Sequence, residues 1–391
     1  MEHYIFYCKL SLLAVLSLIT ACCMLSRRWY VNLAAFLACL SGETFLAHLF
    51  FPGYMLCPAA ASFIILFLSR IWDLSRTPAK GNGADPIRLP VRSGIRESRL
   101  EFHYHYSNFL VYGGAGSGKT KSIGKWLLSE YMRLGFAGFI YDFKDTDYTC
   151  TAYNLIKRHR YPHKFYYVSF DRPERSYRFN PLKVVRDRTE LIQLMEDVLL
   201  ALLPKKEQQN EWVAGGLGIL RGVAFRFWDE FPEHCTLPHI LAFIMTASAR
   251  QLSLFLQQNL VSEMLAGAYL KAEGSEKTQA SYLSTLCNNL ATISQNEEIA
   301  YVLSGDDFDF NLIDPENPKL FAVSNNFSKN SVYAPVISML MTISARQFSM
   351  QNRVPFVYFL DEMTTVNIKN FETLPSVLRE YKAAFILLTQ S

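Results

Sequence analysis

A phosphate-binding loop is the clearest chemical motif in this sequence. Residues 113–120 read Gly-Gly-Ala-Gly-Ser-Gly-Lys-Thr and match the pattern G-x-x-x-x-G-K-[ST] in full. Glycines let a backbone wrap a phosphate with its N–H groups pointing inward, Lys119 can reach the β- and γ-phosphates, and the Thr120 hydroxyl can ligate Mg²⁺. We therefore predict ATP and Mg²⁺ binding by Gly113, Gly114, Ala115, Gly116, Ser117, Gly118, Lys119, Thr120 and Lys121.

An apolar segment that ends in two acids supplies the second half of such a site. Residues 356–362 read Phe-Val-Tyr-Phe-Leu-Asp-Glu, and a continuous apolar run of this length is typical of a central strand buried on both faces. Asp361 is predicted to hold the Mg²⁺ ion, directly or through water. Glu362 is predicted to polarise the attacking water.

Two polar residues further along the chain complete the predicted catalytic set. Gln390 follows a strand predicted at 383–388, where RecA-type motors place a polar residue that senses the γ-phosphate. Arg379 lies in the helix predicted at 374–381 and could act as an arginine finger on a neighbouring subunit's nucleotide. A solvated helix charge is the alternative interpretation of Arg379.

The elements around these motifs predict an α/β fold. A buried strand (108–112) precedes the loop and a helix (121–128) follows it. Further along the chain, apolar residues recur at helical spacing over most of residues 187–297. The helical segments are 187–203, 210–229, 237–247, 249–267 and 277–295. We predict a RecA-like P-loop domain (76–186 and 298–391) with an all-α domain inserted at 187–297.

Residues 1–75 are almost entirely apolar and predict two or three transmembrane helices. The apolar runs are 4–25, 30–51 and 54–69, and a linker rich in Pro and Gly follows. Arginines after the first and third runs place the chain beyond residue 70 in the cytoplasm by the positive-inside rule. A cleaved signal peptide is less consistent with the sequence because more apolar residues follow the first run directly.

Charge and cysteine content add weaker constraints. Lys and Arg outnumber Asp and Glu in 76–186 by 20 to 9, whereas 187–297 holds 8 basic and 13 acidic residues. Opposite charges suggest different partners for the two parts, although a solvated basic surface explains the first equally well. The eight cysteines show no metal-binding spacing, which indicates buried thiols in a reducing compartment and no zinc site.

Taken in order, these motifs resemble the type IV secretion coupling proteins, the VirD4/TraG/TraD family of conjugative DNA-transfer ATPases. The resemblance covers nearly the whole chain. It includes two further segments: Tyr141-Asp142-Phe143-Lys144-Asp145, which is similar to the family's strand-end motif D-x-K-G-[DE], and Phe179-Asn180-Pro181-Leu182, which precedes the helical insertion. Asp145 departs from the family's usual glycine. The family's sequence also continues beyond the position of Gln390, so the chain is expected to be truncated at its C-terminus.

The resemblance implies a homo-hexameric ATPase of the bacterial inner membrane, multi-pass and with its ATPase domain in the cytoplasm. It would pass single-stranded DNA and its bound relaxase to the proteins of a type IV secretion channel. The net negative charge of the insertion favours contact with protein there over contact with phosphates. Two alternatives stay open: an FtsK-like double-stranded DNA translocase, against which the all-α insertion argues, and a nucleotide-binding scaffold without turnover.

Overall fold

The computed structural model describes residues 85–93, 96–114, 116–144, 146–203, 208, 210–368 and 370–390. The chain divides into two units, Met1–Ala84 and Asp85–Ser391. The predicted transmembrane helices fall in the first unit and lie outside the described residues. No helix in the described part of the chain combines the length and hydrophobicity that a membrane crossing requires.

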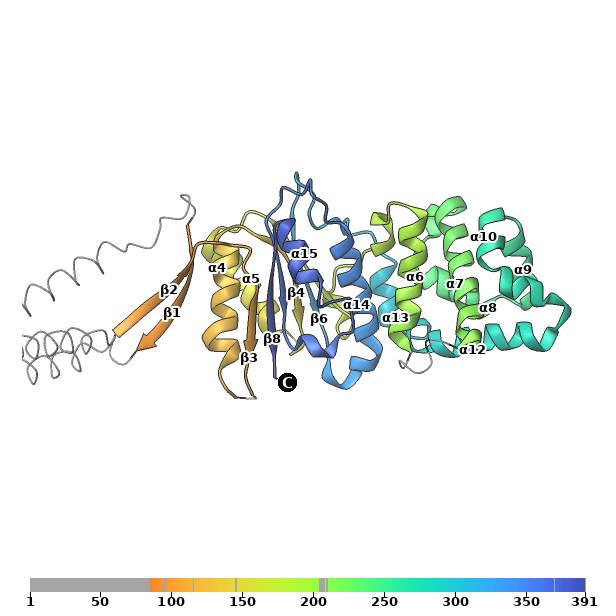
Figure 1. Cartoon of the computed structure of the whole chain (residues 1–391), viewed down its shortest axis with the longest axis horizontal. Helices are drawn as coiled ribbons and strands as arrows, with labels where there is room; N and C mark the ends of the chain where they lie inside the picture. The colour runs from red at the N-terminus through yellow and green to blue at the C-terminus, as the bar shows by residue number, and fades with distance from the viewer. Residues whose placement is uncertain are drawn as a thin grey trace, which may run out of the picture. The chain divides into compact units, whose positions relative to one another are not determined.

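A six-stranded parallel sheet forms the centre of the second unit (Figure 1). Its strand order is β3-β8-β7-β4-β6-β5. The bounds are β3 (Phe109–Tyr112), β4 (Ala137–Asp142), β5 (Lys164–Ser169), β6 (Lys319–Ser324), β7 (Phe356–Leu360) and β8 (Ala383–Thr389). Because the strands are parallel, the residues that directly follow them gather along one edge of the sheet, which we call the carboxyl edge.

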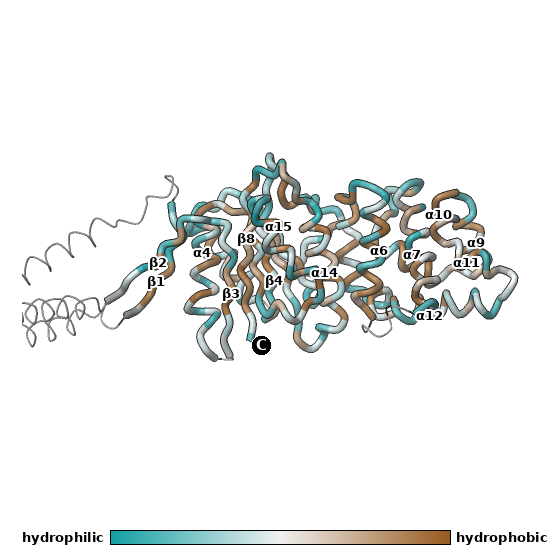
Figure 2. The backbone as a smooth tube through the Cα atoms, in the orientation of Figure 1, coloured by the Kyte–Doolittle hydropathy of each residue, from teal (hydrophilic) through white to brown (hydrophobic). Residues whose placement is uncertain are grey.

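The apolar runs of the central strands arise because both faces of the sheet are covered. In β7, Phe356, Tyr358 and Leu360 belong to one buried cluster, whereas Val357 and Phe359 belong to the other. Side chains alternate between the two faces of a strand, so a strand with helices on both sides must be apolar throughout. Figure 2 shows these hydrophobic stretches running through the sheet.

Helices from different parts of the chain cover the two faces. The helices α4 (Lys125–Arg133) and α5 (Asp147–His159) pack on the face that carries Phe359. The helices α14 (Asn330–Arg346) and α15 (Leu374–Glu380) contribute to the cluster on the opposite face. The predicted α/β class is therefore confirmed for the described residues, as a mixed α/β fold around a parallel sheet.

One strand differs from its prediction. The segment 108–112 was expected to be a buried strand, but β3 lies at the end of the strand order and pairs only with β8 among the described residues. The side chains of Leu110 and Tyr112 are consequently 68% and 70% exposed. Hydrophobicity alone could not reveal this, because an apolar strand has the same sequence pattern at the centre and at the edge of a sheet.

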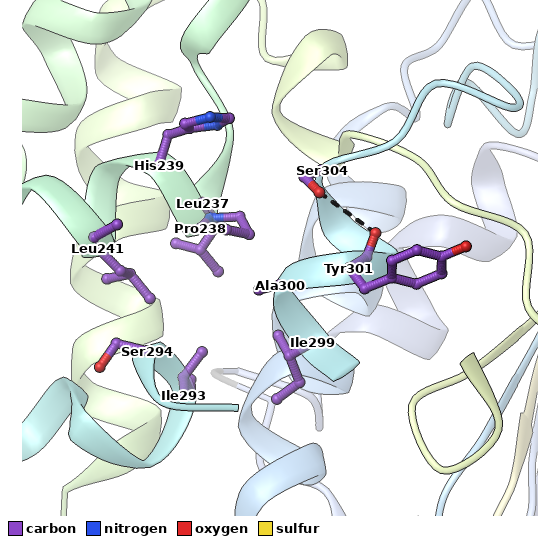
Figure 3. Close-up of a pocket in the computed structure, with 11 residues that line it drawn as sticks. Leu237, Pro238, His239, Leu241, Ile293, Ser294, Ile299, Ala300, Tyr301 and Ser304 are labelled. Carbon is purple, nitrogen blue, oxygen red and sulfur yellow. Dashed lines mark hydrogen bonds between the residues drawn. The ribbon is translucent and has the colours of Figure 1, made fainter. Parts of the chain in front are cut away.

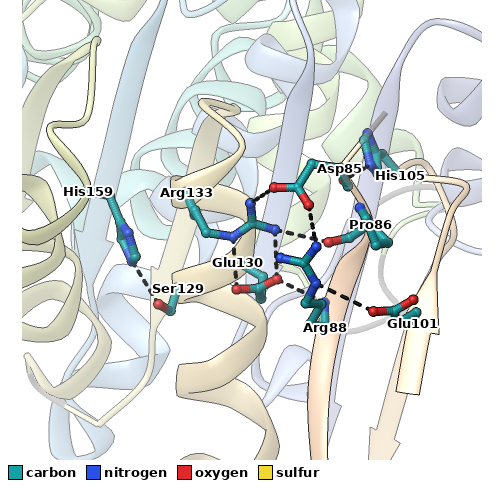
Figure 4. A network of polar contacts seen from close by, with 9 residues as sticks. All are labelled: Asp85, Pro86, Arg88, Glu101, His105, Ser129, Glu130, Arg133 and His159. Carbon is teal, nitrogen blue, oxygen red and sulfur yellow. Dashed lines mark hydrogen bonds and ion pairs between the residues drawn. The ribbon is translucent and has the colours of Figure 1, made fainter. Parts of the chain in front are cut away.

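An antiparallel hairpin precedes the sheet and is fastened to α4 by charged side chains (Figure 4). It comprises β1 (Ile87–Ser93) and β2 (Arg96–Phe102). Glu130 of α4 is 8% exposed and accepts hydrogen bonds from the Arg88 backbone N–H at 2.8 Å and from Arg133 at 2.9 Å. Arg133 also pairs with Asp85. The chain that enters the domain is therefore tied to the helix that continues from the phosphate-binding loop.

The predicted insertion is entirely helical in the described residues. Its helices are α6 (Arg188–Leu202), α7 (Glu211–Glu230), α8 (Leu237–Thr246), α9 (Ala249–Gln257), α10 (Leu260–Leu265), α11 (Gly267–Lys271), α12 (Glu276–Ser294) and α13 (Glu297–Leu303). Short helical turns occur along the chain at η1 (Thr120–Gly124), η2 (Pro173–Arg175), η3 (Pro181–Val184), η4 (Pro232–His234), η5 (Ala272–Gly274), η6 (Phe327–Lys329) and η7 (Met363–Thr365). Asn180, which lies between β5 and the insertion, contacts the insertion because its side-chain amide donates to the Cys235 carbonyl at 2.8 Å.

A hollow of about 370 Å³ opens in the helical part between α8, the end of α12 and α13 (Figure 3). Its lining is mostly apolar and includes Leu241, Ile293, Ile299 and Tyr301. None of the predicted site residues lines it. The predicted chemistry is instead placed at the carboxyl edge of the sheet.

Candidate nucleotide site

The phosphate-binding loop connects the end of β3 to a helix that opens with one π-helical turn, η1. Gly116 and Gly118 have φ angles of 75° and 85°, a conformation that glycine adopts without steric cost. The loop is stabilised internally, since Ser117 N donates to the Gly114 carbonyl at 3.2 Å and Ser122 N donates to the Gly118 carbonyl at 2.8 Å. Ala115 lies outside the described residues.

Lys119 lies at the centre of the site. Its side chain is buried, and its ammonium donates to the Thr389 carbonyl at 3.0 Å and to the Gly113 carbonyl. The same ammonium lies 3.7 Å from a carboxylate oxygen of Glu362. The structure thus brings the loop together with the ends of β7 and β8.

Glu362 is held in place from several sides. It adopts a left-handed backbone conformation (φ 49°), which is uncommon for a residue other than glycine and tends to cluster at functional sites. Gln390 donates to the Glu362 carboxylate twice, through its side-chain amide at 2.6 Å and its backbone N–H at 3.2 Å. Gln390, predicted as a γ-phosphate sensor, therefore contacts the predicted water-activating residue.

Asp361 is the residue in the described site best suited to bind a metal ion. It is 1% exposed, and its Oδ2 atom has no hydrogen-bond partner among the described residues. Burial raises the pKa of the carboxyl to about 7, with Asp142 and Glu362 adding to the effect and Lys144 and Lys119 opposing it. A buried carboxylate oxygen without a partner, next to other acids, fits a divalent cation that would replace the lost solvation.

Magnesium in nucleotide sites needs few protein ligands. It commonly keeps several waters and uses one or two protein groups together with the phosphates of the substrate. No group of three His, Cys, Asp or Glu side chains suited to a metal ion gathers in the described part of the chain. Asp361 and the Thr120 hydroxyl therefore fit Mg²⁺ bound together with a nucleotide, and they do not fit a metal held by protein ligands alone.

Tyr148 of α5 was not predicted to belong to the site. It is fully buried, and its ring lies 4.6 Å from the ring of Phe359, two residues before Asp361. Its hydroxyl packs against the helix after the loop so closely that a Cβ atom on Gly124 would lie 2.4 Å away. Burial raises the pKa of Tyr148, Asp361 raises it further, and the nearby Thr120 side chain lowers it. The hydroxyl is buried near the Thr120 side chain and has no hydrogen-bond partner among the described residues.

Tyr148→Phe should weaken Mg²⁺ binding in the presence of ADP by about tenfold, because groups that orient metal ligands commonly contribute 10- to 100-fold to affinity. The ring packing on Phe359 is retained in this variant. The metal-free protein should unfold at the same or a higher temperature, since a buried hydroxyl is lost. Titration of Mg²⁺ monitored by fluorescent-nucleotide binding measures the first effect and calorimetry the second. An unchanged Mg²⁺ affinity would contradict a role for this hydroxyl.

A chain of hydrogen bonds between neighbouring segments stabilises the turn at Glu362. Thr365 donates to the Glu362 carbonyl at 2.7 Å, and its hydroxyl lies 2.6 Å from that of Tyr141. Asn325 donates to the Tyr141 hydroxyl at 2.8 Å and to the Asn330 side chain at 2.7 Å. These residues come from the ends of β4, β6 and β7, so the carboxyl edge acts as one connected support.

Two predicted residues lie apart from this cluster. The Arg379 side chain is exposed near the end of α15, and its guanidinium lies 5.9 Å from the centre of the Tyr104 ring. Tyr104 precedes β3 and Arg379 precedes β8, so both lie at the amino ends of the strands, opposite the carboxyl edge. Arg379 therefore does not reach the site of its own chain. Lys121 is exposed, and no contact with the buried cluster is seen in the described structure.

The sequence contained a usable signal for one of the missed residues. Asn325 directly follows an apolar strand, β6, as Asp361 follows β7, and polar residues at such positions meet at the carboxyl edge. Tyr148 carried no comparable signal, because a tyrosine in an amphipathic helix has the same pattern whether its hydroxyl faces a site or solvent.

One family model matches most of the chain. Residues 92–391 match the family model described as type IV secretory system conjugative DNA transfer. The chain belongs to this family. The match confirms the resemblance to the coupling proteins and supports that interpretation over a double-stranded DNA pump. No curated protein matches the sequence.

Solved structures of the coupling protein TrwB have a similar fold. A trigonal form in complex with sulphate has a TM-score of 0.57 and 16% identity, over 74% of this chain and 64% of that one. TrwB in complex with ADP and Mg²⁺ has a TM-score of 0.56 and 16% identity, over 73% of this chain and 63% of that one. The coupling-family chain described here thus spans less than two thirds of the length of TrwB and shares its RecA-like fold.

Proposed function

We propose that this chain hydrolyses ATP with Mg²⁺ at the carboxyl edge of its sheet. The observation that carries the proposal is the arrangement of Glu362, which is buried, strained in its backbone and held between Lys119 and Gln390. Phosphoryl transfer requires positioned charge more than covalent chemistry, and this arrangement supplies it.

Each residue has a distinct proposed task. The loop amides and Lys119 neutralise phosphate charge, which requires the ammonium to leave the Thr389 and Gly113 carbonyls. Thr120 and Asp361 would hold a Mg²⁺ ion, which would offset the negative charge of the phosphates. Glu362 orients the attacking water, and Gln390 holds that carboxylate until a γ-phosphate competes for its amide. The structures of TrwB with ADP and Mg²⁺ and with a non-hydrolysable ATP analogue support this assignment by fold.

Hydrolysis is proposed to drive conjugative DNA transfer. The family assignment supports single-stranded DNA with its relaxase as cargo and the channel proteins of a type IV secretion system as partners. We further propose a homo-hexamer in the bacterial inner membrane, anchored through residues 1–75, in which Arg379 faces a neighbouring subunit's nucleotide. The exposure of Arg379 and its distance from its own site support a role of that kind.

ATP turnover by the full chain in detergent micelles, with and without single-stranded DNA, tests this function. Lys119→Ala should abolish turnover and weaken nucleotide binding by about 100-fold, because a charge-assisted contact to phosphate is lost. Stimulation of the wild-type chain by DNA would support a DNA-driven motor. Nucleotide binding without turnover under any condition would instead identify a scaffold that binds nucleotide and would refute the motor.

A further inference from the structure

Phe327 is exposed in a manner that packing does not explain. It lies in the short turn η6 that follows β6 at the carboxyl edge, and its side chain is 80% exposed. A phenylalanine has no polar group to favour contact with water, so such exposure costs free energy. Isolated apolar side chains on a surface are ordinary, so the exposure of this ring indicates a binding site only if its neighbours contribute to one.

The turn that carries Phe327 is held firmly. The Asn326 side chain accepts from Ser328 N at 2.9 Å and donates to Asp171 at 3.1 Å. Lys329 forms an ion pair with the same aspartate at 2.8 Å. The backbone of Asn325 donates to the Asp142 carbonyl of β4 at 2.9 Å. The ring is thus presented to solvent by an ordered support, which lowers the entropic cost of binding a ligand there.

A second aromatic ring and a cation lie beside it. β4 and β6 are neighbours, with Asp142 opposite Ser324, so the residues that follow the two strands meet. The ring of Phe143 lies 6.3 Å from that of Phe327 in an edge-to-face arrangement. Lys144 directly follows Phe143 in the chain, and its side chain is exposed.

We propose that Phe327 and Phe143 stack against a base of single-stranded DNA while Lys144 contacts an adjacent phosphate. The proposal deepens the function proposed above by naming the residues that grip the cargo. Exposed aromatic rings next to basic side chains are the usual means of binding single strands without sequence preference, because every base offers a flat face. A protein partner would use the same apolar ring, but it would have no need of the ring's planarity.

The test is binding of fluorescein-labelled oligothymidine to the full chain in micelles, with Mg²⁺ and the ATP analogue, followed by anisotropy. Phe327→Ala and Phe327→Leu should each weaken binding by about tenfold, whereas Phe327→Trp should bind at least as well as the wild type. Lys144→Ala should also weaken binding, because a contact with a DNA phosphate is lost. Met350→Ala is the matched control, since Met350 is 82% exposed but precedes β7 at the opposite edge of the sheet.

Three results would overturn the inference. If Phe327→Ala binds the oligonucleotide as tightly as the wild type, Phe327 does not contact DNA, and the proposed function in DNA transfer is not affected. If Phe327→Leu binds DNA like the wild type, the contact is apolar and does not require ring stacking. Dissociation of a wild-type oligomer by Phe327→Ala, at unchanged DNA affinity, would assign the ring to a contact between subunits. If the wild-type chain binds no DNA in any nucleotide state, the proposed transfer function fails as well.

Discussion

Glu362→Gln should lower ATP turnover by about 10²- to 10⁴-fold while ATP binding stays within a few-fold of the wild type. The substitution keeps the size of the side chain and removes the charge that orients the attacking water. Binding persists because Lys119 and the loop amides still meet the phosphates. A glutamine also leaves Lys119 without its nearby carboxylate at 3.7 Å, which frees the ammonium for phosphate.

Single-turnover hydrolysis of radiolabelled ATP by the full chain measures this effect, and equilibrium binding of the same nucleotide separates affinity from chemistry. Glu372→Gln is a suitable control, because Glu372 is an exposed carboxylate ten residues further along the same connection. Turnover within threefold of the wild type in Glu362→Gln would show that another group activates the water, and the assignment of Glu362 would be wrong.

The sequence predicted the parts of the site that depend on chain order and strand direction. Lys119, Asp361 and Gln390 each follow an apolar strand or the loop after one, and parallel strands necessarily bring such positions together. The sequence could not predict how their side chains pair. That Gln390 donates to Glu362 depends on the left-handed turn at Glu362, for which an ordinary Leu-Asp-Glu segment gives no signal.

Burial was also beyond prediction at particular positions. Leu110 and Tyr112 have the residue types of a central strand but lie on an edge strand, since strand order is set by contacts between distant segments. Tyr148 and Phe327 each lie in an environment opposite to the one their residue type favours. The residue with a hydroxyl is fully buried beside the site, and the one without a polar group is 80% exposed. Both exceptions lie at the carboxyl edge, where function can outweigh the usual packing preference.

Asp361→Asn should stabilise the metal-free protein at pH 8 and abolish its stabilisation by Mg²⁺ with nucleotide. Burial raises the pKa of Asp361 to about 7 from its ordinary value of 3.8, so between these pH values the folded state binds a proton more tightly than the unfolded state does. Stability of the metal-free wild type therefore falls as pH rises through this range and stays lower above it. An asparagine cannot ionise and avoids that loss.

Differential scanning calorimetry at pH 5 and pH 8 tests the prediction. At pH 8 without metal, Asp361→Asn should unfold about 5 °C above the wild type, and at pH 5 the difference should shrink. Saturating Mg²⁺ and ADP should raise the unfolding temperature of the wild type alone, because binding to the folded state adds to its stability. A lower unfolding temperature of the variant at pH 8 would show that the Asp361 carboxylate is already well satisfied without a cation. The Asp361 carboxylate oxygen is buried without a hydrogen-bond partner in the described structure, so binding of Mg²⁺ would remove the free-energy cost of that burial.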